Sequence, residues 1–213
     1  MPIIGEQEQA QIREMLQRMS GTVNMLVFGQ EGCQACAQTE QLVTELAALS
    51  DKLSAAVYDM DADPAQAELY GIDKAPAIVL VGEKDHGVRF YGLPTGYEFG
   101  ALIEDLVDVS KGTATLGTKS KEFLAQITRP VHIQVFTTPI CPVCPNMVRT
   151  AHKVAIESDL IRAEGIDATE FVELADKYQV QSVPRTIVNE TLIFDGMIPE
   201  GKFLMEIARA ERS

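Results

Sequence analysis

A chain of 213 residues exceeds one typical domain and suffices for two of roughly 100 residues each. Its 18 basic and 31 acidic residues give a net charge of −13 without a Lys/Arg cluster, which argues against nucleic acid and an anionic membrane as partners. No run of about 18 apolar residues indicates a membrane span, and residues 1–6 lack the charged and apolar segments of a signal peptide. We therefore expect a folded cytoplasmic protein in a reducing compartment.

The first half of the chain alternates between helical and strand periodicity, which is typical of an α/β fold. An amphipathic helix over 6–19 is followed by a short β-rich strand over 22–28. The pattern then predicts a helix with apolar positions over 42–49, a strand over 53–60, a proline-started helix over 64–70, a hairpin of 77–81 with 88–91, and a helix over 98–109.

Residues 112–117 are small, polar and flanked by glycine, as is common at a domain boundary. They divide the chain into units 1–112 and 117–213, and because the boundary is short, the two units should pack together. The second unit repeats the order of elements: helix 120–127, strand 131–136, a helix from Pro142, strand 160–166, helix 169–178, a hairpin over 186–194 with a tight turn near Asn189, and helix 201–209.

Cysteine occurs only in two Cys-x-x-Cys pairs, each at the same distance ahead of an X-Pro step. The pair 33–36 precedes Ala75-Pro76, and the pair 141–144 precedes Val183-Pro184, so that each first cysteine leads its proline by 43 residues (33 to 76 and 141 to 184). An offset of 108 residues also superimposes other matching positions, Phe28 on Phe136 among them. One unit has therefore been used twice.

A Cys-x-x-Cys at a helix N-terminus is suited to thiol–disulfide exchange, because free backbone N–H groups and the helix dipole stabilise a thiolate on the first cysteine. We expect Cys33 and Cys141 to be the nucleophiles and Cys36 and Cys144 to be the resolving thiols. Pro142 should occupy the first turn of its helix, where its missing N–H costs nothing.

A Cys₄ metal site is the main alternative use of these four side chains. The two pairs of such a site usually lie about 12–20 residues apart, whereas 104 residues, 37 to 140, separate them here. Each pair also has its own strand, helix and proline. No metal and no cofactor is therefore predicted.

The X-Pro steps each begin a β-rich run, where an isolated trans-proline would have no special role. Because the spacing is repeated, we expect both Ala75-Pro76 and Val183-Pro184 to be cis. In that form Ala75 and Val183 would present their backbone to the dithiol and to an extended substrate segment.

The motif of residues 70–76, Tyr-Gly-Ile-Asp-Lys-Ala-Pro, together with Phe-x-x-x-x-Cys-x-x-Cys, resembles thioredoxin and glutaredoxin. Residues 89–99, 108–112 and 141–153 are similar to those of the glutaredoxin-like protein disulfide oxidoreductases with two tandem thioredoxin folds, over essentially the whole chain. The resemblance implies two thioredoxin-fold units, each a central mixed sheet flanked by helices, that share a joined sheet. It also implies reduction, oxidation or isomerisation of protein disulfides, with thioredoxin reductase as a candidate electron donor.

The chain departs from the thioredoxin pattern in its proton acceptor. Val27 and Val135 occupy the place of the buried Asp in thioredoxin, so Glu164 or Asp167 could serve in the second unit, unless each is a solvated carboxylate at the strand end. The paired glycines that follow the proline in glutaredoxins are missing after Pro184, which weakens the case for glutathione. His152 is interpreted as a packing or surface histidine.

These patterns predict a thiol–disulfide oxidoreductase that acts on protein disulfides. The alternative is an electron carrier dedicated to one partner such as a peroxiredoxin, and a less favoured one is a metal-binding module.

Overall fold

The computed structural model describes residues 2–211. Within these residues, the first half contains four helices and four strands in this order along the chain: α1 (Glu6–Leu16), β1 (Val23–Gly29), α2 (Cys36–Ala47), β2 (Leu53–Asp59), α3 (Pro64–Tyr70), β3 (Ala77–Val81), β4 (Asp85–Tyr91) and α4 (Tyr97–Lys111). This order agrees with the one predicted from periodicity.

The second half repeats that order: α5 (Thr118–Leu124), β5 (Val131–Thr137), α6 (Cys144–Ile156), β6 (Ile161–Asp167), α7 (Val172–Lys177), β7 (Arg185–Val188), β8 (Leu192–Asp195) and α8 (Glu200–Glu211). The turn between β7 and β8 contains Asn189 and Glu190, both at positive φ, so the predicted tight hairpin is confirmed. The boundaries of the two units at 112 and 117 remain a prediction. No helix within residues 2–211 is long and apolar enough to cross a membrane.

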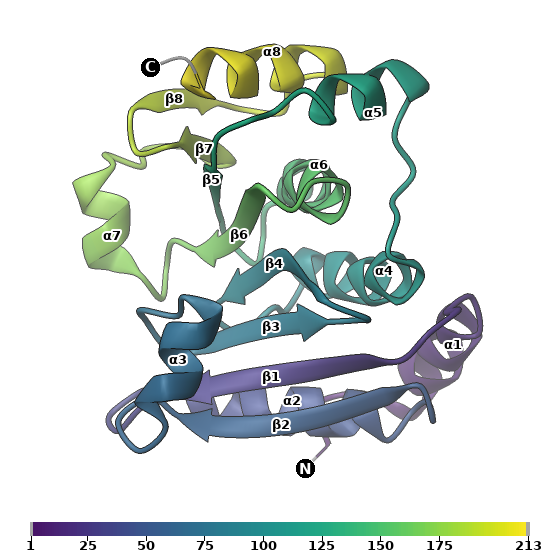
Figure 1. Ribbon diagram of the computed structural model, residues 1–213. Coiled ribbons are helices and arrows are strands. Elements are labelled where there is room, and N and C mark those ends of the chain that lie inside the picture. Colours follow the sequence, from purple (N-terminus) through teal and green to yellow (C-terminus); the bar gives the residue numbers. More distant parts are fainter. Residues whose placement is uncertain (1, 212–213) are drawn as a thin grey trace.

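One eight-stranded mixed sheet runs through both halves in the order β2-β1-β3-β4-β6-β5-β7-β8 (Figure 1). Within each half the first two strands are parallel and the remaining neighbours are antiparallel. The register is repeated as well: Val27 pairs with Val57 and with Ile78, and Val135, 108 residues on, pairs with Gly165 and with Thr186. The repeat seen in the sequence is therefore a repeat of the fold.

The two halves are joined by a parallel pairing of β4 with β6, in which Val88 lies opposite Ala163 and Tyr91 opposite Ile166. Gly87 lies at this junction with φ of +76°, and a Cβ there would collide with the carbonyl oxygen of Ile161. The joined sheet implied by the resemblance is thus confirmed, and both thioredoxin-fold units share it.

Strand β3 is apolar along its whole length, as is typical of a strand with both faces covered. On one face, Met25 and Val27 belong to the large core beneath helices α1, α2, α4, α6 and α8. On the other face, Leu26 and Phe28 belong to a smaller core beneath α3 and α7. Figure 1 shows α3 and α7 on the side of the sheet opposite α4 and α6. The large core crosses the junction between the halves without interruption.

A charged cluster lies between α4 of the first half and α6 of the second. Arg149 donates to Asp105 and to Asp108, the latter at 2.5 Å, and pairs with Glu104 at 3.2 Å. The pKa of the Arg149 guanidinium is raised: burial lowers it, but the surrounding carboxylates outweigh burial. His152 is fully buried in this cluster. The interpretation of His152 as a packing residue is therefore correct, and a surface position is excluded.

Helix α6 begins later than predicted. Val143 is its N-cap residue and Cys144 its first residue, so Pro142 precedes the helix and Pro145 takes the first-turn position instead. Proline fixes φ and supplies no N–H donor, so it is tolerated both just before a helix and in its first turn. The prediction that Pro142 lies in the first turn is therefore wrong.

Candidate functional site

The second dithiol lies at the start of α6, at the end of strand β5. Cys141 and Cys144 form a disulfide, with their Cα atoms 5.5 Å apart. The N–H of Cys141 donates to the carbonyl oxygen of Thr138, which fixes the turn that leads from β5 into the helix. Cys141 is 8% exposed and Cys144 is completely buried. The more accessible sulfur is therefore the one expected to attack.

The first dithiol has the same construction at the start of α2. Cys33 and Cys36 form a disulfide with the same Cα separation of 5.5 Å, and the N–H of Cys33 donates to the backbone carbonyl oxygen of Gln30. Thr39, buried one turn into the helix, donates its hydroxyl to the carbonyl oxygen of Ala35 at 3.0 Å. Both cysteines of this pair are half-buried. The first site is thus the one in which both sulfurs are partly accessible.

Each predicted X-Pro step is cis and lies beside its own dithiol. Ala75-Pro76 and Val183-Pro184 are the cis peptide bonds within residues 2–211. The carbonyl oxygen of Val183 lies 4.0 Å from Sγ of Cys141. In the first half, Ala75 and Pro76 line a cavity of about 600 Å³ together with Cys33. The structure therefore brings the eight predicted site residues together as two groups of four.

Apolar side chains surround the second dithiol at the surface. Ile140 is 86% exposed immediately before Cys141, and Val143 is 43% exposed between the two cysteines. Met197 is 57% exposed in the loop after β8, next to Gly196, whose N–H donates to the carbonyl oxygen of Pro184. Exposed apolar groups of this kind commonly mark contact surfaces for proteins.

The two carboxylates considered as proton acceptors lie in different environments. Glu164 is completely buried, with its Oε1 2.7 Å from Nε2 of His132 and 3.1 Å from a guanidinium nitrogen of Arg162. Burial raises the pKa of Glu164, but the hydrogen bond from His132 and the nearby positive charges hold it below its usual value. The expectation of a solvated strand-end carboxylate is wrong for Glu164. Asp167 is largely buried and accepts from the backbone N–H and hydroxyl of Thr169 at 2.8 and 2.7 Å.

A third carboxyl group, Glu98 in the first turn of α4, was not predicted as part of a site. It is 6% exposed, and one of its oxygens has no hydrogen-bond partner within the described residues. Burial, with smaller contributions from Asp105 and Asp167, raises the pKa of Glu98 to about 8. Glu98 lines a small cavity with Thr137, Pro139 and Asp167, beneath the loop that leads to Cys141.

Helix α4 is held against that loop by its own N-terminal residues. The N–H of Tyr97 donates to the carbonyl oxygen of Pro139 at 3.3 Å, and Gly96, with φ of +58°, leaves no room for a Cβ against the same oxygen. A residue of the first unit, Glu98, is thereby placed beside the loop that precedes the second dithiol. A hint is present in the sequence, since positions 98, 101, 102 and 105 share one helix face, on which two acidic residues flank two apolar ones.

Arg185, the cation just after the second cis-proline, is paired with groups of its own hairpin and of the segment after α7. Its guanidinium donates to the carboxylate of Asp195 at 2.8 Å and to the carbonyl oxygen of Tyr178 at 3.0 Å. Among residues 2–211, no group of three or more His, Cys, Asp or Glu side chains is arranged to hold a metal ion.

Two helix-start disulfides, each beside a cis-proline, define a catalyst of dithiol–disulfide exchange. The family profile for the thioredoxin domain matches residues 23–104 and again 131–209. The chain belongs to the thioredoxin-domain family, and its two tandem thioredoxin folds place it with the protein disulfide oxidoreductases.

Solved structures support this assignment. A protein disulfide oxidoreductase from Aeropyrum pernix k1 is 30% identical, with a TM-score of 0.92 over 98% of this chain and 94% of that one. The F subunit of alkylhydroperoxide reductase from Enterococcus faecalis (V583), in a C503A mutant, has the same fold, with a TM-score of 0.89 at 23% identity over 95% of this chain and 98% of that one.

Curated relatives are much longer than this chain. The F subunit of alkyl hydroperoxide reductase from Xanthomonas campestris pv. phaseoli is 27% identical over 156 residues, which make up 73% of this chain and 28% of that protein. A protein named NADH dehydrogenase from Bacillus subtilis (strain 168) is 26% identical over 148 residues, or 70% of this chain and 27% of that protein. The matched segment thus spans less than a third of each of these two relatives.

Proposed function

We propose that Cys33 and Cys141 are the attacking thiols and that Cys36 and Cys144 are the resolving thiols of two sites that exchange with protein disulfides. The observation that carries this proposal is the position of each first cysteine next to a cis-proline step. The carbonyl oxygen of Val183 lies 4.0 Å from Sγ of Cys141, and Pro76 lines the same cavity as Cys33. An extended substrate segment that pairs with the backbone of Ala75 or Val183 would bring its own disulfide to the sulfur.

In the reducing direction, a thiolate on Cys141 attacks one sulfur of the substrate disulfide. A mixed disulfide forms, and the first substrate thiolate leaves. The thiolate of Cys144 then attacks Sγ of Cys141, which closes the Cys141–Cys144 disulfide and releases the second substrate thiolate. Two electrons pass from the dithiol to the substrate, and the reverse sequence oxidises a substrate dithiol.

The resolving step requires that the buried Cys144 loses a proton. We assign Glu98 as the candidate acceptor, because its raised pKa lies in the range in which a carboxylate can take a proton from a thiol. Its position beneath the loop before Cys141 supports this role. Asp167, which lines the same cavity, is the second candidate.

The substrate class that fits the second site is a partly unfolded protein, since Ile140, Val143 and Met197 present apolar surface around Cys141. A carrier role toward a peroxiredoxin is the second candidate function, favoured by the similarity to the F subunit of alkyl hydroperoxide reductase. Either role needs an electron donor to reopen the disulfides, for which a disulfide reductase such as thioredoxin reductase is suitable.

Insulin reduction separates these two candidate functions. Full-length Cys33→Ser/Cys36→Ser and Cys141→Ser/Cys144→Ser variants should each retain part of the activity, and the variant with all four substitutions should retain none. Activity that survives all four substitutions would exclude the assigned cysteines. Rapid reduction of an oxidised peroxiredoxin together with negligible insulin reduction would favour the carrier.

A further inference from the structure

The cavity beside the first dithiol has walls from both units. The first unit contributes Cys33, the turn of Gln34 and Ala35, the Ala75-Pro76 step and Leu93. The remaining wall is formed by Thr169 and Glu170, from the turn that follows β6 in the second unit. The first site is therefore completed by residues that lie more than 70 positions further along the chain.

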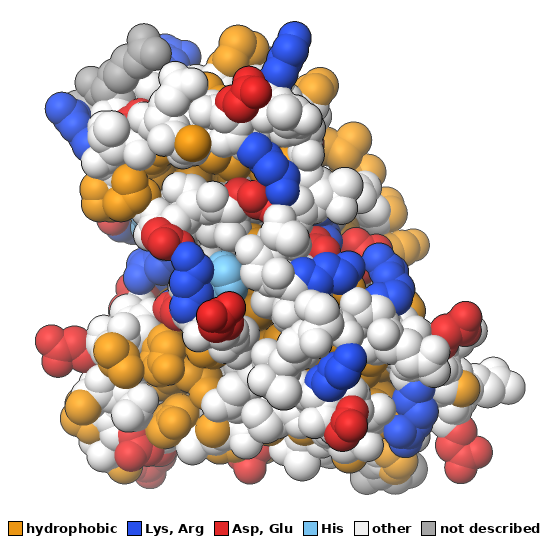
Figure 2. Space-filling model, turned by 45° about the vertical axis from the view of Figure 1, so that its right-hand side comes forward, with side chains coloured by type: hydrophobic (Ala, Val, Ile, Leu, Met, Phe, Trp, Pro, Cys, Tyr) orange, Lys and Arg blue, Asp and Glu red, His pale blue; other side chains and the backbone are white. Residues whose placement is uncertain are grey.

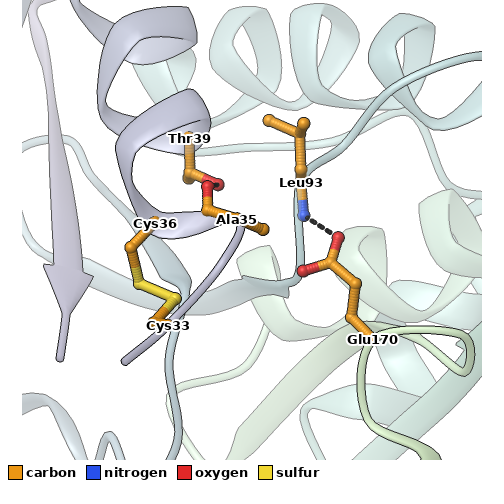
Figure 3. Close-up of a disulfide and its surroundings, with 6 residues drawn as sticks. All are labelled: Cys33, Ala35, Cys36, Thr39, Leu93 and Glu170. Atoms are coloured by element: carbon orange, nitrogen blue, oxygen red, sulfur yellow. Dashed lines mark hydrogen bonds between the residues drawn. A yellow bond between two sulfur atoms is a disulfide. The ribbon is translucent and has the colours of Figure 1, made fainter. Parts of the chain in front are cut away.

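Glu170 is attached to this wall by a hydrogen bond to the first unit. The N–H of Leu93 donates to Oε1 of Glu170 at 2.7 Å, and Figure 3 shows the carboxylate reaching Leu93 next to Ala35 and the disulfide. Gly92 makes this approach possible: its φ is +98°, and a Cβ there would lie 3.2 Å from the same oxygen.

The second dithiol has the equivalent loop but lacks the equivalent wall. Gly196 corresponds to Gly92, since the N–H of each donates to the carbonyl oxygen of its own cis-proline, Pro184 or Pro76. The residue after Gly196 is Met197, whose side chain is 57% exposed. The residue after Gly92 is Leu93, which is less exposed and lies next to Glu170. The two sites thus differ around the residue after this glycine: at the first site its N–H donates to a carboxylate, and at the second site its side chain is an exposed thioether.

Among the described residues that line the first cavity, Glu170 is the charged one, and the others are apolar or neutral polar. Lys74, which adjoins Ala75, is directed elsewhere: its ammonium lies 3.8 Å from the ring centroid of Tyr91 and 2.6 Å from Asp73. A substrate segment that enters this cavity therefore meets a negative charge with no lining cation to balance it. The hollow visible between the two halves in Figure 2 is a different one, because Lys or Arg side chains and a histidine gather there, whereas none of these lines the first cavity.

We propose that Glu170 is a specificity-determining residue of the first dithiol, which selects disulfides flanked by basic residues and disfavours those flanked by acidic ones. This inference rests on the proposed role of Cys33 as a nucleophile. It also divides the work of the protein, because the apolar rim of the second site suits unfolded segments regardless of their charge. The wall belongs to the second unit, so selection at the first site depends on the joined sheet.

The test uses full-length protein that carries Cys141→Ser/Cys144→Ser, so that only the first site acts. Burial raises the pKa of Glu170, so the assay is run at about pH 8, well above the ordinary pKa of a glutamate. Three peptides with the same internal disulfide, flanked by Lys, Gln or Glu, are reduced at low and at high salt. We expect kcat/KM to fall from the Lys to the Glu peptide by about tenfold at low salt and by less at high salt. Glu170→Gln, which keeps an acceptor for Leu93, should narrow that ratio to about twofold.

Two controls separate Glu170 from the net charge of −13, which attracts basic peptides everywhere. Glu173→Gln changes the charge by the same amount on α7, away from the first cavity, and should keep the tenfold ratio. The Cys33→Ser/Cys36→Ser protein should show a smaller ratio than the first site. Equal rates for all three peptides, or an unchanged ratio in Glu170→Gln, would overturn the inference while leaving Cys33 as a nucleophile. No reduction of any peptide would instead reject the proposed function of this site, and the inference with it.

Discussion

Nδ1 of His152 lies 2.6 Å from Oδ2 of Asp105, which connects a helix of the second half to a helix of the first. The other ring nitrogen lies 3.1 Å from the carbonyl oxygen of Arg89, and Phe90 packs edge-on against the imidazole. Asp105 also accepts from Arg149. The buried carboxylate of Asp105 therefore serves as hydrogen-bond partner to both Arg149 and His152 at the junction of the units.

We expect Asp105→Asn to lower the free energy of unfolding by about 3 kcal/mol, because it leaves the buried Arg149 with less compensating charge. Urea denaturation followed by circular dichroism measures the change. The matched control is Glu104→Gln: Glu104 pairs with the same guanidinium but its side chain is 53% exposed, so the loss should stay below about 1 kcal/mol. Equal losses in the two variants would show that burial of the pair is unimportant.

Glu98 should make stability dependent on pH. Its pKa is raised from 4.5 to about 8 on folding, mainly by burial, so the folded state binds an extra proton between those values. The contribution of this group is therefore most favourable below its unfolded pKa and is lost as the pH rises through the folded pKa. Relative to the wild type, Glu98→Gln should gain at most about 1.4 kcal/mol of unfolding free energy per pH unit across that window.

Denaturant titrations at a series of pH values, with the disulfides kept oxidised, give this slope directly. Glu104→Gln again serves as the control, because its parent carboxylate is half exposed on the same helix. A constant difference between Glu98→Gln and the wild type at all pH values would show that Glu98 is ionised throughout. In that case the pKa of Glu98 is not raised by folding, and the assignment of Glu98 as the acceptor for the proton of Cys144 loses its basis.

The apolar rim of the second dithiol should matter for large substrates. Met197→Ser removes exposed apolar surface beside Cys141 and should lower kcat/KM for insulin by about threefold to tenfold, corresponding to the loss of part of one buried side chain. Reduction of a small aromatic disulfide should fall much less. Met205→Ser, which changes a methionine 64% exposed on α8, is the control. Matching losses in both methionine variants would rule out a specific contact at Met197.

Gly92 should not tolerate a side chain. Its φ of +98° is unfavourable for other residues, and a Cβ would lie 2.8 Å from Cβ of Asp167 in the other half. We expect Gly92→Ala to cost about 2 kcal/mol of stability. Gly100→Ala, at an exposed position of α4 with open space around it, should instead stabilise by about 0.5–1 kcal/mol. Thermal unfolding of both variants compares strained with relaxed glycine positions.

The duplicated architecture could be predicted because its signals are local and occur twice. The spacing from Cys33 to Pro76 is repeated from Cys141 to Pro184, and apolar periodicity indicates each strand and helix. The family resemblance then implied the joined sheet. The start of α6 was misplaced by two residues because proline is compatible both with the turn before a helix and with its first turn.

The contributions of one unit to the site of the other could not be predicted. Glu98 lies 43 residues before Cys141, and Glu170 lies 137 residues after Cys33, so no motif spans either pair. Their positions follow from the pairing of β4 with β6, which is a contact between distant segments. The expectation that Glu164 is a solvated carboxylate failed for the same reason, since the cations that surround it include Lys74 of the first unit.

The pairing of β4 with β6 also determines what a shortened chain would expose. A cut between residues 112 and 117 would leave each piece with a new edge strand, whose backbone N–H and C=O groups had been paired across the junction. Unprotected edges of this kind recruit other strands and lead to aggregation. The first piece would also retain Asp105 and Asp108 without Arg149, and the second piece would retain Arg149 without these carboxylates. The two halves therefore resemble independent domains in sequence, yet each half protects an edge strand of the other from solvent.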